Sequence, residues 1–275
     1  DPDNNPATPP VPYENQLTGM YQGQPYALTN GNIGSNSAIG LDSNAKVFGN
    51  ATPGPGSSVT LDSNGYVLGS TTPASALVVL PPITLPPAAA LAPTALNVGS
   101  NDTVALPAGE YHFSSLTLDS NSAVTIAGPA VIVADHFNTD SNTAIRFDTT
   151  NGPVQVYGTG WFRLDSNSAV SSLTQVPGDV QIMITTDNYT GYETSPTGNP
   201  LSPVKIGSNA ALYAAVYAPN AIVRLDSNGG FFGAIVGKVL AQDSNFGIHY
   251  DEALGRLSSG PPKYVSKGWI EVPTT

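Results

Sequence analysis

Residues 224–250 read RLDSNGGFFGAIVGKVLAQDSNFGIHY, and one short unit occurs in them twice, at 226–228 and 243–245. The unit is Asp-Ser-Asn, and the stretch between its two copies is apolar and β-prone. Ser-Asn recurs along the chain, with Asn at positions 36, 44, 64, 101, 121, 142, 167, 209, 228 and 245. Successive copies lie 8, 20, 37, 20, 21, 25, 42, 19 and 17 residues apart. Apart from the first, these intervals cluster near 20 or near twice 20, which predicts stacked repeats that bury their faces against one another.

The segments between the copies favour short β-strands. Residues 123–127, 130–134 and 180–184 are apolar or alternate, and turn residues bound them. No helical periodicity extends over ten residues. We therefore predict an all-β fold, a single-stack, right-handed parallel β-helix with about ten coils of roughly 20 residues each. The two doubled intervals predict coils that lost the motif or carry insertions.

The expected domain boundaries follow from composition. Residues 1–30 are polar and Pro-rich and predict an extended arm, whereas 31–257 hold the β-helix and 258–275 a C-terminal tail. Loop insertions are expected near 74–93 and 187–203. A short helix over 250–257 and the tail would form a C-terminal cap.

The Asp-Ser-Asn unit is interpreted as a structural corner between two strands. Its first position is Asp in seven copies and Gly in three, and both residues are acceptable in turns, including at positive φ. Ser and Asn can bond turn backbone groups, and stacked Asn can form a ladder between coils. The predicted corner residues are Asp42, Ser43, Asn44, Asp62, Ser63, Asn64, Asp119, Ser120, Asn121, Asp140, Ser141, Asn142, Asp165, Ser166, Asn167, Asp226, Ser227, Asn228, Asp243, Ser244 and Asn245.

A calcium site is the alternative interpretation of these corners. Carboxylates at one corner of coils ~4.8 Å apart repel one another unless solvated or bridged by a cation. Asp119, Asp140 and Asp165 stand in successive copies and would be the ligands. Against this, each copy offers a single carboxylate. A regular row of small polar residues could instead order water.

Composition excludes several function classes. The net charge of −11 disfavours nucleic acid and anionic membrane surfaces. No run approaches the ~20 apolar residues of a membrane-spanning helix, so membrane insertion of this form is not expected. There is no cysteine, and charged residues are only 11% of the chain. With Asp1 as the first residue, these features predict an extracellular or cell-surface protein from which an N-terminal signal or anchor has been removed.

The sequence does not predict an enzyme. Its five Glu and three His are scattered, and no cofactor motif is present. The best constellation is His249, Asp251 and Glu252, which could act in acid–base chemistry on a polysaccharide. We interpret it as the polar end of a cap.

Residues 204–254 resemble the C-terminal signature of a poorly characterised bacterial family of secreted, type IV pilus-associated β-helix domains with Ser-Asn repeats. The matching motifs are GSN at 207–209, YAPNA at 217–221, GAIVGK at 233–238 and IHYDEAL at 248–254. The resemblance implies a secreted or surface-exposed bacterial β-helix and supplies no catalytic residues. The family more often has Gly than Asp before Ser-Asn. There is a weaker likeness to bactofilins, whose β-helices polymerise end to end.

The function expected from these features is structural. The chain would be a β-solenoid subunit of a surface layer or filament, self-associating end to end or through its termini. An adhesin or carbohydrate-binding module is the first alternative, with Tyr189 and Tyr192 stacking on cell-surface glycans. A polysaccharide-active enzyme is the second. No cofactor is expected beyond the possible calcium.

Overall fold

The computed structural model describes residues 19–21, 24–26, 31–41, 45–174, 176–186, 203–242, 245–250 and 254. These residues form β-strands and two short 3-10 helices, η2 (Pro87–Ala90) and η3 (Pro177–Asp179). The chain divides into two compact units. Unit 1 comprises Asp1–Leu80 with His249–Thr275, and unit 2 comprises Pro81–Ile248.

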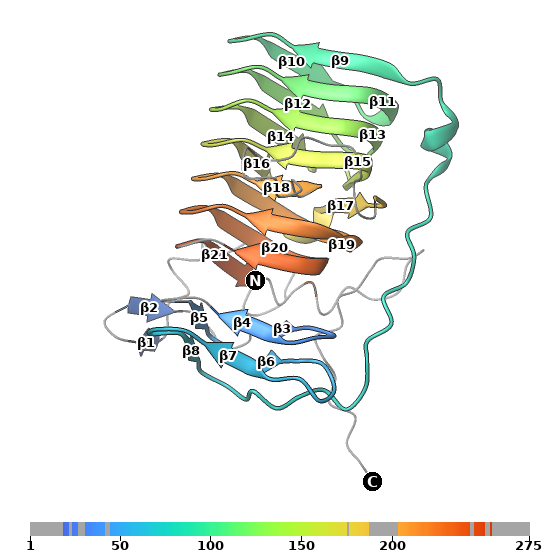
Figure 1. Cartoon of the computed structure of the whole chain (residues 1–275). Coiled ribbons are helices and arrows are strands. Elements are labelled where there is room, and N and C mark those ends of the chain that lie inside the picture. The colour runs from blue at the N-terminus through green and yellow to red at the C-terminus, as the bar shows by residue number, and fades with distance from the viewer. Residues whose placement is uncertain are drawn as a thin grey trace, which may run out of the picture. The chain divides into compact units, whose positions relative to one another are not determined.

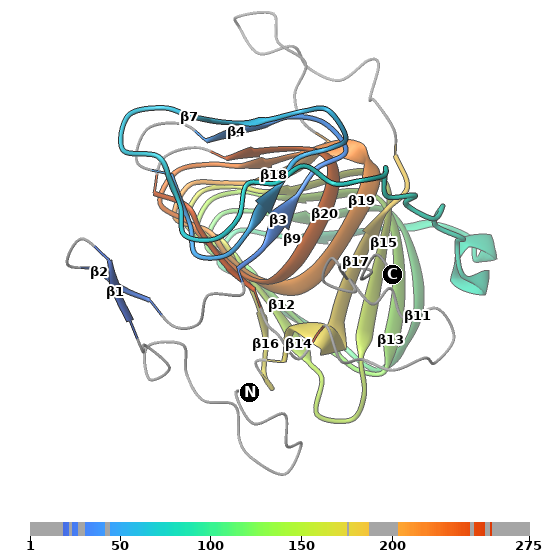
Figure 2. The same cartoon turned by 90° about the horizontal axis from the view of Figure 1, so that it is seen from below.

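Unit 2 is a parallel β-solenoid whose coils have three faces (Figures 1 and 2). Face 1 holds β10 (Thr103–Leu106), β12 (Ala123–Ala127), β14 (Ala144–Asp148), β16 (Ala169–Ser172) and the first parts of β19 (Ala211–Leu225) and β20 (Gly230–Gln242). Face 2 holds the first parts of β11 (Gly109–Leu118), β13 (Ala130–Thr139) and β15 (Val154–Leu164), then β17 (Val180–Ile184) and the middle of β19 and β20. Face 3 holds β9 (Thr94–Val98), the last parts of β11, β13 and β15, then β18 (Val204–Ile206) and the ends of β19 and β20. β21 (Gly247–Tyr250) pairs with β20.

Unit 1 repeats the same arrangement over two shorter coils. Its three parallel pairs are β3 (Ile33–Gly34) with β6 (Ala51–Thr52), β4 (Ile39–Leu41) with β7 (Val59–Leu61), and β5 (Lys46–Val47) with β8 (Tyr66–Val67). With unit 2 this makes about nine turns, so the predicted parallel β-solenoid is confirmed. The turns are shared between the two units.

The two ends of the chain are described only in part. Within the predicted arm, β1 (Gly19–Tyr21) and β2 (Gln24–Tyr26) form a short antiparallel pair. The rest of residues 1–30 lies outside the described residues, as does the tail 258–275. The predicted helix over 250–257 lies outside them as well, except for Tyr250 and Leu254.

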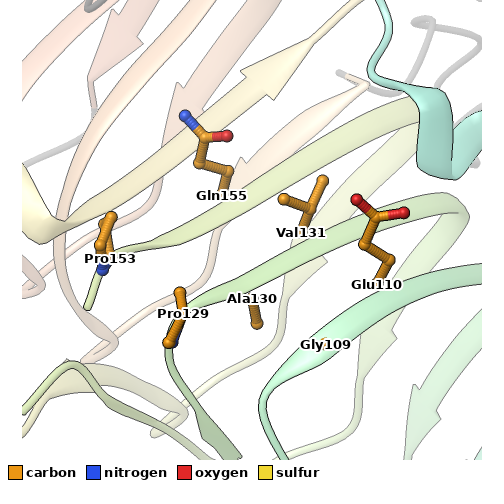
Figure 3. Close-up of a pocket in the computed structure, with 7 residues that line it drawn as sticks. All are labelled: Gly109, Glu110, Pro129, Ala130, Val131, Pro153 and Gln155. Atoms are coloured by element: carbon orange, nitrogen blue, oxygen red, sulfur yellow. The ribbon is translucent and has the colours of Figure 1, made fainter. Parts of the chain in front are cut away.

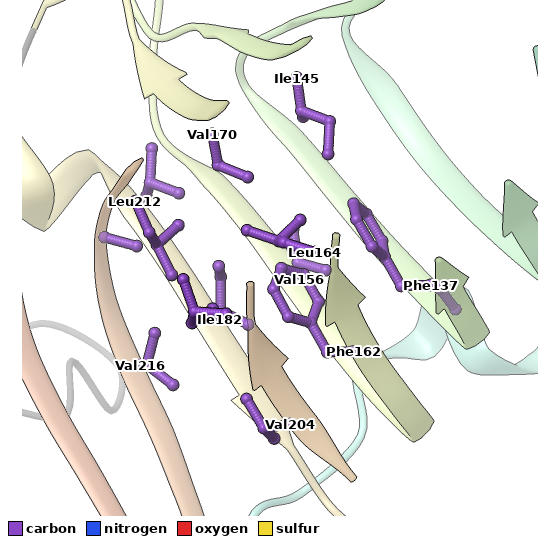
Figure 4. Close-up of a cluster of buried hydrophobic side chains, with 14 of the residues drawn as sticks. Phe137, Ile145, Val156, Phe162, Leu164, Val170, Ile182, Val204, Leu212 and Val216 are labelled. Carbon is purple, nitrogen blue, oxygen red and sulfur yellow. The ribbon is translucent and has the colours of Figure 1, made fainter. Parts of the chain in front are cut away.

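The core of unit 2 is a set of apolar rows that run from coil to coil (Figure 4). In face 1, Val124, Ile145, Val170 and Leu212 occupy equivalent positions and are fully buried. In face 3, the rings of Phe137 and Phe162 stack, with centroids 4.5 Å apart. Burial of each such side chain stabilises the fold by about 1.5–3 kcal/mol. The rows are apolar in most coils, and small polar residues replace an apolar one at Thr139, the equivalent of Leu118, and at Ser172, the equivalent of Phe147.

The 42-residue interval between Asn167 and Asn209 is one coil with an insertion. Ala169 pairs directly with Ala211, and β18 pairs with both β15 and β19, so no coil has been skipped. The inserted residues 187–202 lie outside the described residues. The 37-residue interval differs, because it contains the boundary between the two units and a Pro-rich segment.

Part of the predicted insertion at 74–93 packs against unit 2. We call residues 81–93 the strap. It begins at β19, where the Tyr217 hydroxyl donates to the Pro81 carbonyl (2.6 Å), and it ends at β11, where His112 Nδ1 lies 2.8 Å from the Leu91 carbonyl. Between these points η2 packs on β11 and β13 with Ala88 fully buried. The strap therefore crosses face 2 over several coils.

The strap explains an otherwise unexpected row of buried side chains. Val133, Tyr157, Met183 and Tyr217 point away from the core, because each follows an inward residue on its strand. All four are nevertheless buried. We infer that the strap covers this outward row and gives face 2 a second apolar layer.

Candidate functional site

The Ser-Asn copies of unit 2 form the corner between face 3 and face 1. The asparagine has left-handed backbone in these corners and in the Asn64 corner of unit 1. The φ angles lie between 55° and 65°. These residues are Asn64, Asn101, Asn121, Asn142, Asn167, Asn209, Asn228 and Asn245. No described first position has positive φ; the left-handed residue of the corner is the asparagine two positions later. Asn is among the few non-glycine residues that tolerate this conformation.

The corner is a hydrogen-bonded turn that also links neighbouring coils. In one copy, the Ser122 amide donates to the Asp119 carbonyl (3.1 Å), and the Asn121 amide donates to the Ser141 carbonyl of the next coil (3.2 Å). Two steps of the predicted side-chain ladder are present, from Asn209 to Asn167 and from Asn245 to Asn228, both 3.2 Å. The corner is thus a structural joint. Residues 42–44 and 243–244 lie outside the described residues.

Asn36 is an exception that explains the opening interval of eight residues. Its φ is not positive, and its side chain both accepts from the Val78 amide and donates to the Val78 carbonyl, each at 2.8 Å. It therefore fixes the chain segment that follows β8, rather than forming a corner.

In one copy, close packing against a neighbouring coil explains why the first corner position is glycine. A Cβ on Gly207 would lie 2.7 Å from both the Asp165 carbonyl carbon and the Leu164 carbonyl oxygen. No side chain fits there, so Asp cannot replace Gly207 without moving a neighbouring coil.

The residue after the asparagine is the part of the corner that sequence reasoning missed. Ser122, Thr143 and Ser168 occupy it and are buried. Ser122 Oγ donates to the Asp119 carbonyl (2.6 Å), and Thr143 Oγ1 donates to Ser168 Oγ (2.9 Å). The sequence does indicate this position, because most Ser-Asn copies are followed by a small residue.

The carboxylates proposed for calcium do stand at one position of successive coils. Asp119 and Asp140 are exposed, whereas Asp165 is half-buried and accepts the Ser166 amide (2.8 Å). Among the described residues no three His, Cys, Asp or Glu side chains gather closely enough to hold a metal ion. Calcium binding therefore stays a prediction.

Cations lie beside these carboxylates on face 3. Arg163, Lys205 and Arg224 occupy one outward row. Asp226 pairs with Lys205 at 3.2 Å and with Arg224 at 2.7 Å. A polar notch of about 170 Å³ lies next to this row. It is lined by Asn138, Thr139, Asp140, Arg163, Leu164, Asp165 and Lys205.

The residues predicted for the alternative functions are mostly outside the described residues. These are Tyr189, Tyr192, Asp251 and Glu252. His249 lies in β21 and is half-buried, and its burial lowers its pKa. The predicted acid–base group of His249, Asp251 and Glu252 therefore stays a prediction.

Face 2 carries an open pocket of about 360 Å³ near the corner that leads to it from face 1 (Figure 3). Its floor is apolar, and the Glu110 carboxylate and the Gln155 amide are its polar groups. Gln155 also donates to Gln181 (3.0 Å). The lining residues are Gly109, Glu110, Pro129, Ala130, Val131, Pro153 and Gln155.

A polar cluster that was not predicted lies where face 2 meets face 3. His112 Nε2 is 3.8 Å from Asp135 Oδ1, and the Thr159 hydroxyl donates to the same carboxylate oxygen at 2.5 Å. The ring of His136 stacks on Trp161, with centroids 3.7 Å apart. The spacing of these residues could have indicated the cluster from the sequence, because it is close to the length of one coil between His112 and Asp135 and again between Asp135 and Thr159.

The first coil of unit 2 leaves part of its core uncovered. Within the described residues, β9 and β10 each have one neighbouring strand, β11 and β12 respectively. In this coil Leu96, Val104 and Leu106 are only half-buried. Their equivalents in the next coil are Leu116, Val124 and Ile126, all 0% exposed. We call the edge formed by β9 and β10 the open end.

The fold and these corners define a parallel β-solenoid protein. A family model described as a domain of unknown function (DUF7305) matches residues 89–257, which is more than half of the chain, and the chain belongs to this family. The match includes every strand of unit 2 from β9 onward. No curated protein and no solved structure matches the chain.

The part of the chain that the structure describes contains no helix with the length and apolar character needed to cross a membrane.

Proposed function

We propose that the protein is a non-enzymatic structural subunit of an extracellular surface layer or filament, and that its subunits associate through the open end. The observation that carries this proposal is the difference in burial between the first and second coils of unit 2. Three core positions that are fully buried in the second coil are half-exposed in the first.

The open end combines two features that favour association. Among the strands that the structure describes, none pairs with the outer edge of β9 and β10, and such an edge is a template for pairing with another chain. The adjacent apolar rows end at Leu96, Val104 and Leu106. Covering them removes apolar surface from water, which is favourable.

A second copy of this chain is the partner that fits the open end best. The coils of unit 2 place mostly apolar side chains at the same inward positions. A coil from another copy would therefore continue the rows that β9 and β10 leave unfinished. The terminal repeats of repeat proteins commonly carry a polar outer face that caps the stack. In the first coil of unit 2, by contrast, the partly exposed residues include the apolar Leu96, Val104 and Leu106.

The extracellular assignment is part of the same proposal. It is supported by the low content of charged residues and by the many Ser, Thr, Asn and Gly residues. Protease treatment of intact cells tests it directly, because a surface protein is cleaved while a cytoplasmic marker is not. Protection of the protein until the cells are lysed would contradict the assignment.

The association itself is tested by sedimentation velocity over a range of concentrations. Leu96→Lys with Val104→Lys places charges at inward positions of the open end, a device that prevents edge pairing. Asn97→Lys with Ala105→Lys is the matched control, because these neighbours on the same strands are exposed. The wild type and the control should form larger species as concentration rises, and the inward variant should stay monomeric.

Circular dichroism confirms that each variant keeps its fold. Association of the inward variant at wild-type concentrations would overturn the role of the open end. A wild type that remains monomeric at every concentration would overturn assembly altogether.

Glycan binding, the alternative function, stays a prediction. Its residues, Tyr189 and Tyr192, belong to the insertion that leaves the coil after β17 and returns before β18. Replacing both with Ala and measuring binding to cell-surface glycans tests it.

A further inference from the structure

The cluster where face 2 meets face 3 joins four parts of unit 2. His112 belongs to β11, Asp135 to β13 and Thr159 to β15, and Leu91 belongs to the strap. The His112 side chain is 13% exposed and that of Asp135 is 40% exposed. The cluster is therefore sheltered on the histidine side and accessible to solvent on the carboxylate side.

The hydrogen bond from His112 to the strap sets which ring nitrogen is available. The Leu91 carbonyl can only accept, so His112 Nδ1 donates to it (2.8 Å). In the neutral ring the lone pair is then on Nε2. Nε2 faces the Asp135 carboxylate at 3.8 Å, which is too long for a direct hydrogen bond.

Asp135 is oriented in a similar way. Its Oδ1 accepts the Thr159 hydroxyl at 2.5 Å. Histidine that donates its other nitrogen to a carbonyl, together with a carboxylate that is itself hydrogen-bonded, is the usual arrangement around metal ligands in proteins. Each partner fixes the direction of the ligand atom before a metal binds.

The geometry points to a binding site for a divalent transition metal, with His112 Nε2 and Asp135 as the protein ligands. Neutral imidazole and carboxylate are ligands for zinc, with metal–ligand distances of about 2.0–2.2 Å. The 3.8 Å between the two ligand atoms is shorter than the sum of two such distances, so both atoms can bind one ion in a bent arrangement. Water molecules complete the coordination.

Binding would connect the strap to the coils. Through His112 the ion is linked to the Leu91 carbonyl, and through Asp135 to Thr159 two coils away from β11. An ion held only by the folded protein stabilises it by mass action. The metal would therefore act as a clip that holds the strap on face 2.

The site differs from the predicted calcium ligands. Asp119, Asp140 and Asp165 lie at the opposite side of face 3, at the corner with face 1, and they offer oxygen atoms alone. Imidazole nitrogen favours zinc, copper or nickel over calcium. The two hypotheses therefore predict different metals as well as different residues.

The test is titration of the full chain with ZnCl2, followed by isothermal calorimetry and by thermal unfolding. His112→Asn keeps an amide donor for the Leu91 carbonyl and removes Nε2. Asp135→Asn keeps an acceptor for Thr159 and removes the charge. His136→Gln is the matched control, because that ring is adjacent in sequence and stacks on Trp161.

Wild type and His136→Gln should bind one equivalent of zinc and unfold at a higher temperature when zinc is present. Both ligand variants should bind at least tenfold more weakly and lose the shift in Tm. Calcium chloride should leave this site empty and is the metal control. Absence of zinc binding, which would make His112 and Asp135 only an ion pair, overturns the proposal. Undiminished zinc binding by either ligand variant overturns the proposal as well. If one of the two variants fails to fold, the other still provides the test.

Discussion

At the scale of single residues, one asparagine in each corner accepts the left-handed conformation that the turn requires. The same residue donates its amide to the next coil, so the conformation and the contact between coils are fixed together. Asn121 is the best position at which to test the backbone conformation, because its side chain is exposed and its replacement removes little packing. Its backbone has a φ of 60°.

We expect Asn121→Ala to reduce the free energy of unfolding by about 1–2 kcal/mol, the usual cost of left-handed backbone for a residue with a Cβ. Asn121→Gly should cost less, because glycine adopts this conformation freely. Urea denaturation of the three proteins measures the difference. Equal losses in the two variants would mean that the side chain, rather than φ, determines the stability of the corner.

A second residue-scale prediction concerns His249 in β21. Burial lowers its pKa below the ordinary value of 6.5, so the folded protein favours the neutral ring. The stability linked to this ring is fully present above about pH 6.5, where the unfolded chain is also neutral. It is lost as the pH falls through the pKa of the folded state.

Replacement by His249→Gln should therefore flatten the decline in stability as the pH falls below about 6.5. Chemical denaturation of wild type and variant at several pH values gives the comparison, and taking the difference removes the shared titration of carboxylates. A variant that loses stability over this range as steeply as the wild type would show that His249 is not responsible.

At the scale of elements, the strap is the feature that most alters a plain solenoid. It lies across strands that are far from it in sequence, and the bond between Tyr217 and Pro81 joins residues 136 positions apart. Beneath it Val133 and Met183 are almost completely buried on what would otherwise be an outer surface. The strap thus contributes to stability without belonging to any coil.

We expect Tyr217→Phe to destabilise the protein by about 0.5–1.5 kcal/mol, because the Pro81 carbonyl loses its donor. Limited proteolysis should also cut residues 81–93 faster. Tyr111→Phe is a suitable control, since the Tyr111 hydroxyl donates to Pro107, only four residues away. Faster cleavage of the strap in the control than in Tyr217→Phe would contradict the assigned role.

At the scale of the whole chain, the repeat spacing was enough to predict the fold. Coils pair residue by residue, so Asn101, Asn121 and Asn142 repeat at the same spacing as the strands. Insertions leave this register intact, and the 42-residue interval therefore still closes one coil.

The remaining features depend on contacts that spacing does not record. The 37-residue interval resembles the 42-residue one in length, yet it contains a unit boundary. His112 and Asp135 carry no motif, and only the register of β11 and β13 brings them together. Leu96 and Leu116 are the same residue type in equivalent positions, and only their place in the stack leaves Leu96 half-buried while Leu116 is fully buried.

Negative-stain electron microscopy of the native protein at increasing concentration tests most directly whether subunits associate through the open end. We predict filaments or layers in the wild type, and only single particles in the variant that carries Leu96→Lys and Val104→Lys. Single particles of the wild type at every concentration, or identical assemblies in the variant, would contradict the proposal that subunits join at β9 and β10.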